Sequence, residues 1–120
     1  MKTYEFFSGK DLEIADLIQR RRLQLLIHSS IYYHFNTNII SDRQWDLWAK
    51  ELVSLQKEYP NIASRVIWDD VFQDWDGTTG AFLPITDSWV IGKVQQLFGL
   101  SYKKVVKPKP IIKPIKHRLF

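Results

Sequence analysis

Apolar residues recur at helical spacing along the first part of the chain and predict a long helix. It is predicted to begin near Ser8 or Asp11, either of which can cap it, and to run to about Phe35. Three consecutive arginines at positions 20–22 would fan around this helix, so we interpret them as a solvated segment. The apolar positions are Leu12, Leu17, Ile18, Leu25, Ile31, Tyr32 and Phe35.

A second helix is predicted from a capping box and an unbroken apolar seam. In the box, Ser41 would accept a hydrogen bond from the amide of Gln44, whose side chain would reach back. Pro60 ends the helix, and a polar turn at residues 36–38 precedes it. Two helices joined by a short turn form an antiparallel hairpin. The seam consists of Trp45, Trp48, Leu52, Leu55 and Tyr59.

The second half of the chain is less regular. Residues 62–75 fit either a third helix or a short strand pair, and Thr86 or Asp87 can cap a helix that ends before Gly99. After Tyr102, lysine and proline alternate with branched aliphatic residues, which favours an extended arm. The predicted fold is therefore mainly α: an antiparallel helical hairpin plus one or two further helices, over residues 1–100, and a basic proline-rich arm over 101–120.

The arm carries the positive charge of the protein. Residues 1–100 contain 10 basic and 13 acidic side chains, whereas residues 101–120 contain 7 basic and none acidic. Such an arm can bind nucleic acid or an acidic protein surface, or serve only as a disordered, solubilising tail. Its interspersed isoleucines favour a protein partner. The cationic positions are Lys103, Lys104, Lys107, Lys109, Lys113, Lys116 and Arg118.

Composition argues against several classes of protein. Without cysteine there is neither a disulfide framework nor a thiolate site, and the three histidines lack metal-ligand spacing, so no metal site is expected. No apolar run reaches the roughly 18 residues that a membrane span needs. No signal peptide opens the chain, so we expect a cytoplasmic protein.

Candidate binding chemistry is concentrated in residues 32–46, which read YYHFNTNIISDRQWD. Asp42, Trp45 and Asp46 are spaced i, i+3 and i+4, so they share one face of the second helix. Such a face can stack against a flat cationic ring and match its charge. Alternatively, Tyr32 and Trp45 belong to the core, Asp42 caps the helix, and Asp46 pairs with a lysine one turn later.

Residues 25–60, LLIHSSIYYHFNTNIISDRQWDLWAKELVSLQKEYP, resemble the N-terminal helical (Ia) domain of bacterial NAD-dependent DNA ligases. In that family the domain closes over the nicotinamide mononucleotide (NMN) half of NAD. The resemblance implies that Tyr32 and Tyr33 line the nicotinamide pocket and that Asp42 and Asp46 engage the mononucleotide. Trp45 replaces the usual tyrosine, so a stacking face is kept and a phenol hydroxyl is lost.

The resemblance does not extend to catalysis. The lysine nucleophile of the family lies in Lys-x-Asp-Gly, whereas residues 74–77 read Asp-Trp-Asp-Gly. We therefore expect no enzyme, no catalytic residue and no required cofactor, with NAD or NMN as a ligand. The chain is similar to short ligase-related phage proteins, which would place it in the bacterial host cytoplasm. A protein-interaction module, or a nucleic-acid adaptor working through the arm, is the alternative.

Overall fold

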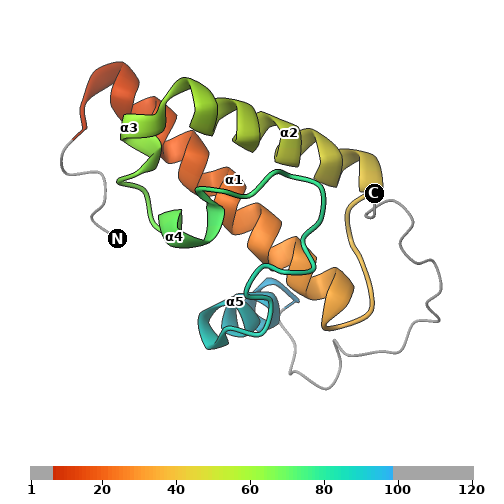
Figure 1. The fold of residues 1–120 in the computed structure, drawn as a ribbon. Coiled ribbons are helices and arrows are strands. Elements are labelled where there is room, and N and C mark those ends of the chain that lie inside the picture. The colour runs from red at the N-terminus through yellow and green to blue at the C-terminus, as the bar shows by residue number, and fades with distance from the viewer. Residues whose placement is uncertain (1–6, 99–120) are drawn as a thin grey trace.

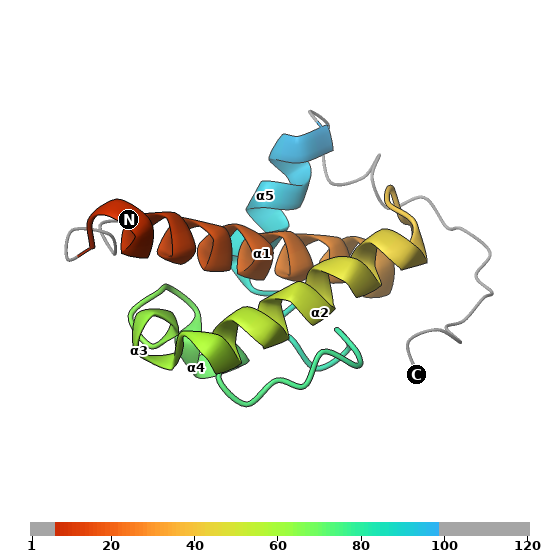
Figure 2. The ribbon, with the colours of Figure 1, turned by 90° about the horizontal axis from the view of Figure 1, so that it is seen from above.

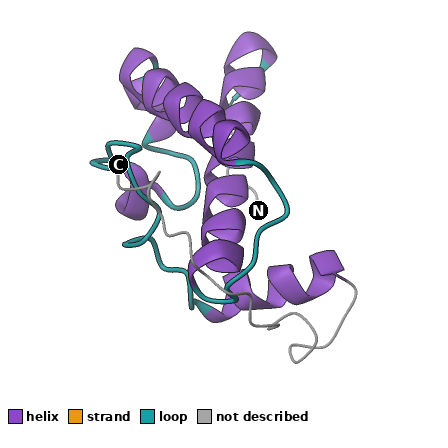
Figure 3. Ribbon diagram, turned by 90° about the vertical axis from the view of Figure 1, so that its right-hand side faces the viewer, coloured by secondary structure: helices purple, strands orange, loops and turns teal. Residues whose placement is uncertain are grey.

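The computed structural model describes residues 7–98, and within them the chain forms five helices and no strand (Figures 1 and 3). The mainly α fold is confirmed. The predicted arm and the boundary at residue 100 lie outside the described residues. The helices are α1 (Gly9–Tyr33), α2 (Asp42–Glu58), α3 (Pro60–Ala63), α4 (Asp69–Phe72) and α5 (Ser88–Phe98).

The two long helices form the predicted antiparallel hairpin, and α2 returns along α1 (Figure 1). The connection turns at Asn36, whose φ of 56° is left-handed, a conformation that asparagine tolerates. Ser41 caps α2, since its hydroxyl accepts the Gln44 amide at 3.0 Å. Ser8 occupies the N-cap position of α1, yet its side chain makes no capping hydrogen bond.

The apolar seam of α2 packs into the main hydrophobic core. Trp45 and Leu52 are buried against Ile18, Leu25 and other apolar residues of α1, and the remaining seam residues pack around them partly buried. Burial of this stripe, rather than helix propensity alone, holds the two helices together.

Arg22 contradicts the prediction that the arginine triplet is solvated. Its side chain is fully buried, and its guanidinium donates to Gln56 Oε1 (2.9 Å), to the carbonyls of Val66 (3.0 Å) and Ile67 (3.2 Å), and to Asp69 Oδ1 (3.3 Å). We call this set the Arg22 clamp. Burial lowers the pKa of Arg22, and the neighbouring Asp69 partly offsets that effect. The clamp ties residues 66–69 to the hairpin.

The ambiguous segment 62–75 forms neither a full helix nor strands. The two short helices α3 and α4 flank a turn in which Trp68 has a φ of 73°. That conformation is rare for a bulky residue, and the Arg22 clamp holds two carbonyls before it and the side chain of Asp69 after it. Residues 73–87 then cross the hairpin as an irregular loop (Figures 1 and 3).

Helix α5 packs on the C-terminal half of α1, on the side opposite α2 in the view of Figure 2. Asp87 caps it as predicted, because its carboxylate accepts the amide of Trp89 at 2.8 Å. Val94 of α5 is buried with Ile31 and Phe35 in a second, smaller core cluster. This cluster fixes the end of α1, from which the candidate site is built.

Candidate functional site

A hollow opens between the end of α1, the 38–41 connection and the start of α2. Its enclosed volume is about 20 Å³, enough for about one water molecule, and it widens into about 310 Å³ of empty space that includes open solvent. It is a shallow, half-open site. The residues that line it are His28, Ser29, Tyr32, Tyr33, Asn38, Ile39, Ile40, Ser41, Asp42 and Trp45.

Four of the five predicted site residues line this hollow. Tyr32 and Tyr33 contribute from the last turn of α1, and Asp42 and Trp45 from the first turn of α2. Asp46, one turn further along α2, is half-buried and outside the lining. The structure thus brings the tyrosine pair of α1 together with two residues of α2 that lie nine or more positions further along the sequence.

Trp45 lies at the base of the hollow, and it does not offer an open ring surface for stacking. Only 4% of it is exposed, and its indole N–H donates to Ser29 Oγ at 3.2 Å. Its ring also meets Trp75 edge-on, with centroids 5.9 Å apart. The indole is therefore committed to the core, and little of its face is left for a ligand.

The two tyrosines are held at right angles to each other. Their ring centroids are 4.9 Å apart with an interplanar angle of 85°, a favourable edge-to-face pair. The phenol of Tyr33 lies 3.3 Å from Thr79 Oγ1, in the loop between α4 and α5. Both residues line the hollow.

The loop that carries Thr79 packs against residues that line the hollow. The Trp75 indole donates to the Thr79 carbonyl at 2.9 Å, and Thr79 Oγ1 accepts the Ala81 amide at 3.1 Å. A Cβ at the buried Gly80 would collide with the Ser29 side chain and lie 3.2 Å from the Trp45 ring. The loop therefore approaches the hairpin so closely that only glycine fits.

His28, one of the three histidines without metal-ligand spacing, also lines the hollow. Its ring tilts against Trp48 at 5.5 Å, while its buried Nδ1 has no hydrogen-bond partner among the described residues. Burial lowers the pKa of His28, so the imidazole is neutral at pH 7. Its position one turn before Tyr32 on the same helix face was the available signal.

In the described part of the chain, no three histidine or acidic side chains are grouped so that they could hold an ion. Among residues 7–98, no helix is long and apolar enough to cross a membrane. What the hollow offers is aromatic surface, one carboxylate, one neutral imidazole and several hydroxyl and amide groups. These groups suit recognition of a small polar ring.

Comparison with known proteins supports a relation to DNA ligase. Over 55 residues the chain is 36% identical to a DNA ligase of Fusobacterium nucleatum. The matched region is 46% of this chain and 8% of the ligase, so the chain corresponds to a small part of that protein. No protein-family model and no solved structure matches the chain. The chain thus contains a region related in sequence to DNA ligase.

Proposed function

We propose that this chain is a non-catalytic binding protein derived from the NMN-binding clamp of an NAD-dependent DNA ligase, the Ia domain. Its ligand is NMN, or the same half of NAD, bound at the hollow. The likeness to short ligase-related phage proteins extends the proposal to a phage-encoded protein acting in the bacterial cytoplasm.

The observation that carries this proposal is the convergence of Tyr32, Tyr33, Asp42 and Trp45 on one hollow. A helical hairpin needs only an apolar seam to fold, and it has no need of an open site lined by a tyrosine pair and a carboxylate. The ligase-related region supports the proposal independently. Both observations point to a retained recognition element.

The size of the hollow predicts weak binding. An enclosed volume of about 20 Å³ cannot surround a nicotinamide ring, so the ligand would remain largely in solvent unless the 38–41 connection moves. In the ligase family a second domain covers the other half of NAD. We expect NMN to bind with a Kd of about 0.1–1 mM.

The absence of catalysis is proposed because the chain has no Lys-x-Asp-Gly, and its single x-x-Asp-Gly, at residues 74–77, begins with aspartate. Here the Trp75 indole bonds to the Thr79 carbonyl, and Asp76 accepts both the amide (3.0 Å) and the hydroxyl (2.7 Å) of Thr78. These contacts build a turn. Incubation with NAD and magnesium should leave the intact mass unchanged, and an added AMP would overturn the proposal.

Isothermal titration with NMN tests the site directly. Asp42→Ala removes the carboxylate of the lining and should weaken binding roughly 10- to 100-fold, since a charge-assisted contact contributes roughly 1.5–3 kcal/mol. Asp46→Ala lies outside the lining and should weaken it less, with a melting temperature within a few degrees of wild type. Asp74→Ala, an exposed carboxylate elsewhere, is the matched control. No heat at millimolar NMN would contradict the proposal.

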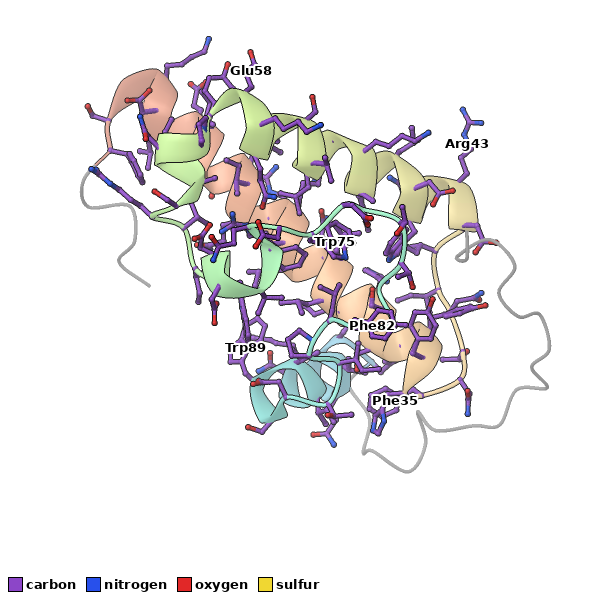
Figure 4. The ribbon with its side chains drawn as sticks, in the orientation of Figure 1. Phe35, Arg43, Glu58, Trp75, Phe82 and Trp89 are labelled. Atoms are coloured by element: carbon purple, nitrogen blue, oxygen red, sulfur yellow. The ribbon has the colours of Figure 1, made fainter. Side chains whose placement is uncertain are left out.

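A protein-interaction role is the second candidate, and exposed apolar residues favour it. Phe82, at the tip of the loop that braces the hollow, is 90% exposed (Figure 4), and Ile39 in the lining is 48% exposed. A contiguous patch of exposed apolar residues often marks a partner surface. Phe82→Ser should leave NMN binding intact if the two roles are separate.

The basic arm has two candidate partners, duplex DNA and another protein, and the two can be told apart by experiment. Duplex DNA binding should weaken steeply with salt, with a logarithmic slope near −0.9 per phosphate contact. A protein partner should instead depend on Ile111, Ile112 and Ile115, and it should be lost when all three are changed to serine. We propose the protein partner, because phosphate binding does not need these side chains.

A further inference from the structure

Two tryptophans, one just before α4 and one on the first turn of α5, pair with each other away from the hollow. The rings of Trp68 and Trp89 are tilted by 53° with centroids 6.3 Å apart, and Trp89 is 40% exposed (Figure 4). The indole N–H of Trp68 is buried without a hydrogen-bond partner among the described residues, whereas those of Trp45 and Trp75 donate within the chain. We call Trp68 and Trp89 the tryptophan pair.

The fold holds Trp68 in an uncommon conformation. Its φ of 73° is rare for a bulky residue, and the Arg22 clamp fixes two carbonyls before it and the side chain of Asp69 after it. Such conformations persist only where the surrounding structure enforces them, and they are frequent at binding sites. Together with the exposure of Trp89, this makes the tryptophan pair a candidate contact surface.

The chain around the tryptophan pair is acidic. Residues 66–92 contain five aspartates and neither lysine nor arginine. Arg22 offsets part of this charge, since it pairs with Asp69 at 3.3 Å and also interacts with Asp70. Lys93 offsets another part, and its Nζ lies 5.4 Å from the ring centroid of Trp89. Counting both cations still leaves three carboxylates in excess, and Asp70 and Asp74 are exposed.

The C-terminal arm has the complementary chemistry. Residues 107–115 read KPKPIIKPI, which is three lysines, three prolines and three isoleucines without an acidic residue. Aromatic surfaces recognise proline-rich segments, because the preferred extended conformation of such segments loses little entropy on binding and leaves their carbonyls free to accept hydrogen bonds. Prolines and isoleucines can therefore pack on the two indole rings while the lysines face the aspartates.

The arm is long enough to reach the tryptophan pair of its own chain. The described chain ends at Phe98, nine residues after Trp89 on α5, which is about 13.5 Å by helical rise. Residues 99–106 span up to about 26–29 Å when fully extended. The stretch 107–115 can therefore return along α5 to the pair.

Tethering favours the arm of the same chain over the arm of a second copy. A short linker gives an effective concentration on the order of 1 mM. A contact with a Kd of about 1 mM would then be about half formed within the chain, but only about 5% formed between copies at about 50 µM protein.

We infer that residues 107–115 bind the tryptophan pair of their own chain, with prolines and isoleucines on the rings and lysines toward the aspartates of residues 66–92. The inference rests on the protein-binding role proposed for the arm, names the surface involved, and does not depend on NMN binding. An outside partner of the arm must displace this contact.

A nitroxide spin label on the full chain tests the contact. The chain has no cysteine, so His117→Cys carries a single label just beyond residues 107–115 and keeps every lysine. In a nitrogen-15 spectrum the nitroxide should broaden the indole signals of Trp68 and Trp89 several-fold more than that of Trp48, on α2 across α1 from α5 (Figure 2). Raising the salt from about 50 to 500 mM should reduce this excess broadening.

A matched arm variant separates binding from mere tethering. Changing Pro108, Pro110 and Pro114 together to glycine keeps every charge and the chain length, and should lower the excess broadening of the tryptophan pair several-fold. Trp89→Ala should likewise lower the broadening of Trp68. Unchanged broadening in both variants, or equal broadening of Trp48 and the pair in the unaltered arm, would overturn the inference.

A mixed sample identifies which chain supplies the arm. Nitrogen-15 chain without the nitroxide is mixed with unenriched chain that carries it, so only contacts between copies can broaden the observed signals. Broadening of the tryptophan pair in this mixture would assign the contact to a second copy and overturn the inference. If the inference fails while an outside protein still requires Ile111, Ile112 and Ile115, the role proposed for the arm stands, and NMN titration tests the hollow separately.

Discussion

The Arg22 clamp and the hollow lie roughly two turns apart on α1, and they use polar side chains differently. In the clamp, all three guanidinium nitrogens of a fully buried arginine donate to partners within the chain. In the hollow, His28 Nδ1 is buried with no partner among the described residues, and the lining faces open space.

This difference distinguishes polar side chains that stabilise the fold from polar side chains that can contact a ligand. Polar groups that are satisfied within the chain secure the fold, because leaving any of them unpaired when buried costs free energy. A buried polar atom without a partner among the described residues, such as His28 Nδ1, does not stabilise the fold and can be satisfied by a ligand. Substitutions in the clamp should therefore change stability, and substitutions in the hollow should change mainly binding.

The largest expected effect comes from Arg22→Met. The variant leaves Gln56, two backbone carbonyls and Asp69 without their shared donor, so the free energy of unfolding should fall by about 3–5 kcal/mol. Urea unfolding followed by circular dichroism measures it. Arg20→Met is the matched control, since Arg20 makes an exposed pair with Asp16 at 2.8 Å and should cost under about 1 kcal/mol. Similar losses of stability in both variants would mean that the buried Arg22 clamp stabilises the fold no more than an exposed ion pair.

The burial of Arg22 also marks a limit of sequence-based prediction. Three consecutive arginines point to three sides of a helix, and local spacing does not indicate which side another segment will cover. The partners lie 34 to 47 positions away. The hairpin, by contrast, was predictable, because the capping box, the apolar seam and Pro60 are all local signals.

The candidate site was predictable in part for the same reason. Tyr32, Tyr33, Asp42 and Trp45 belong to two helix ends joined by a short connection, so their convergence follows from the hairpin. The loop at 75–83 was not predictable, because its close approach to Ser29 depends on tertiary packing. That loop explains why Trp45, expected to stack on a ligand, is instead largely buried.

Gly80→Ala tests whether the loop supports the hollow. A methyl group there would stand 2.8 Å from Ser29 Cβ and 3.2 Å from the Trp45 ring, so the loop or these side chains must shift. We expect a loss of about 1–3 kcal/mol in unfolding free energy and weaker NMN binding. Gly92→Ala, in α5 with nothing within 4 Å, should stabilise by about 0.5–1 kcal/mol and leave binding unchanged. Unaltered NMN binding in Gly80→Ala would show that the loop and the hollow are independent.

The pH dependence of stability should reveal the neutral imidazole of His28 in the hollow. Because burial lowers the pKa of His28 below its ordinary 6.5, the unfolded chain takes up this proton first as pH falls. Stability is then fully present above pH 6.5 and lost below it, with a slope of at most about 1.4 kcal/mol per pH unit. His28→Gln should flatten the slope between about pH 7.5 and 5.5 in urea unfolding. Equal slopes in the two proteins would mean that His28 is protonated equally well in the folded state.

The smallest expected effect concerns the contact between Tyr33 and Thr79, where the hollow meets the supporting loop. The two oxygens are 3.3 Å apart and partly buried, so Tyr33→Phe should cost about 0.5–1 kcal/mol. Thr79→Val should cost more, because Thr79 Oγ1 also accepts the Ala81 amide. The double variant should fall short of the sum by about 0.5 kcal/mol, the expected coupling between direct partners.

Thr79→Ser keeps the hydroxyl and serves as the control for the lost methyl group in this cycle. If this contact positions Tyr33 for the ligand, Tyr33→Phe and Thr79→Val should weaken NMN binding by similar factors, and the double variant should weaken it no further. Strictly additive losses in stability and in NMN affinity would mean that Tyr33 and Thr79 act independently. The loop would then cover the hairpin without positioning Tyr33 for the ligand.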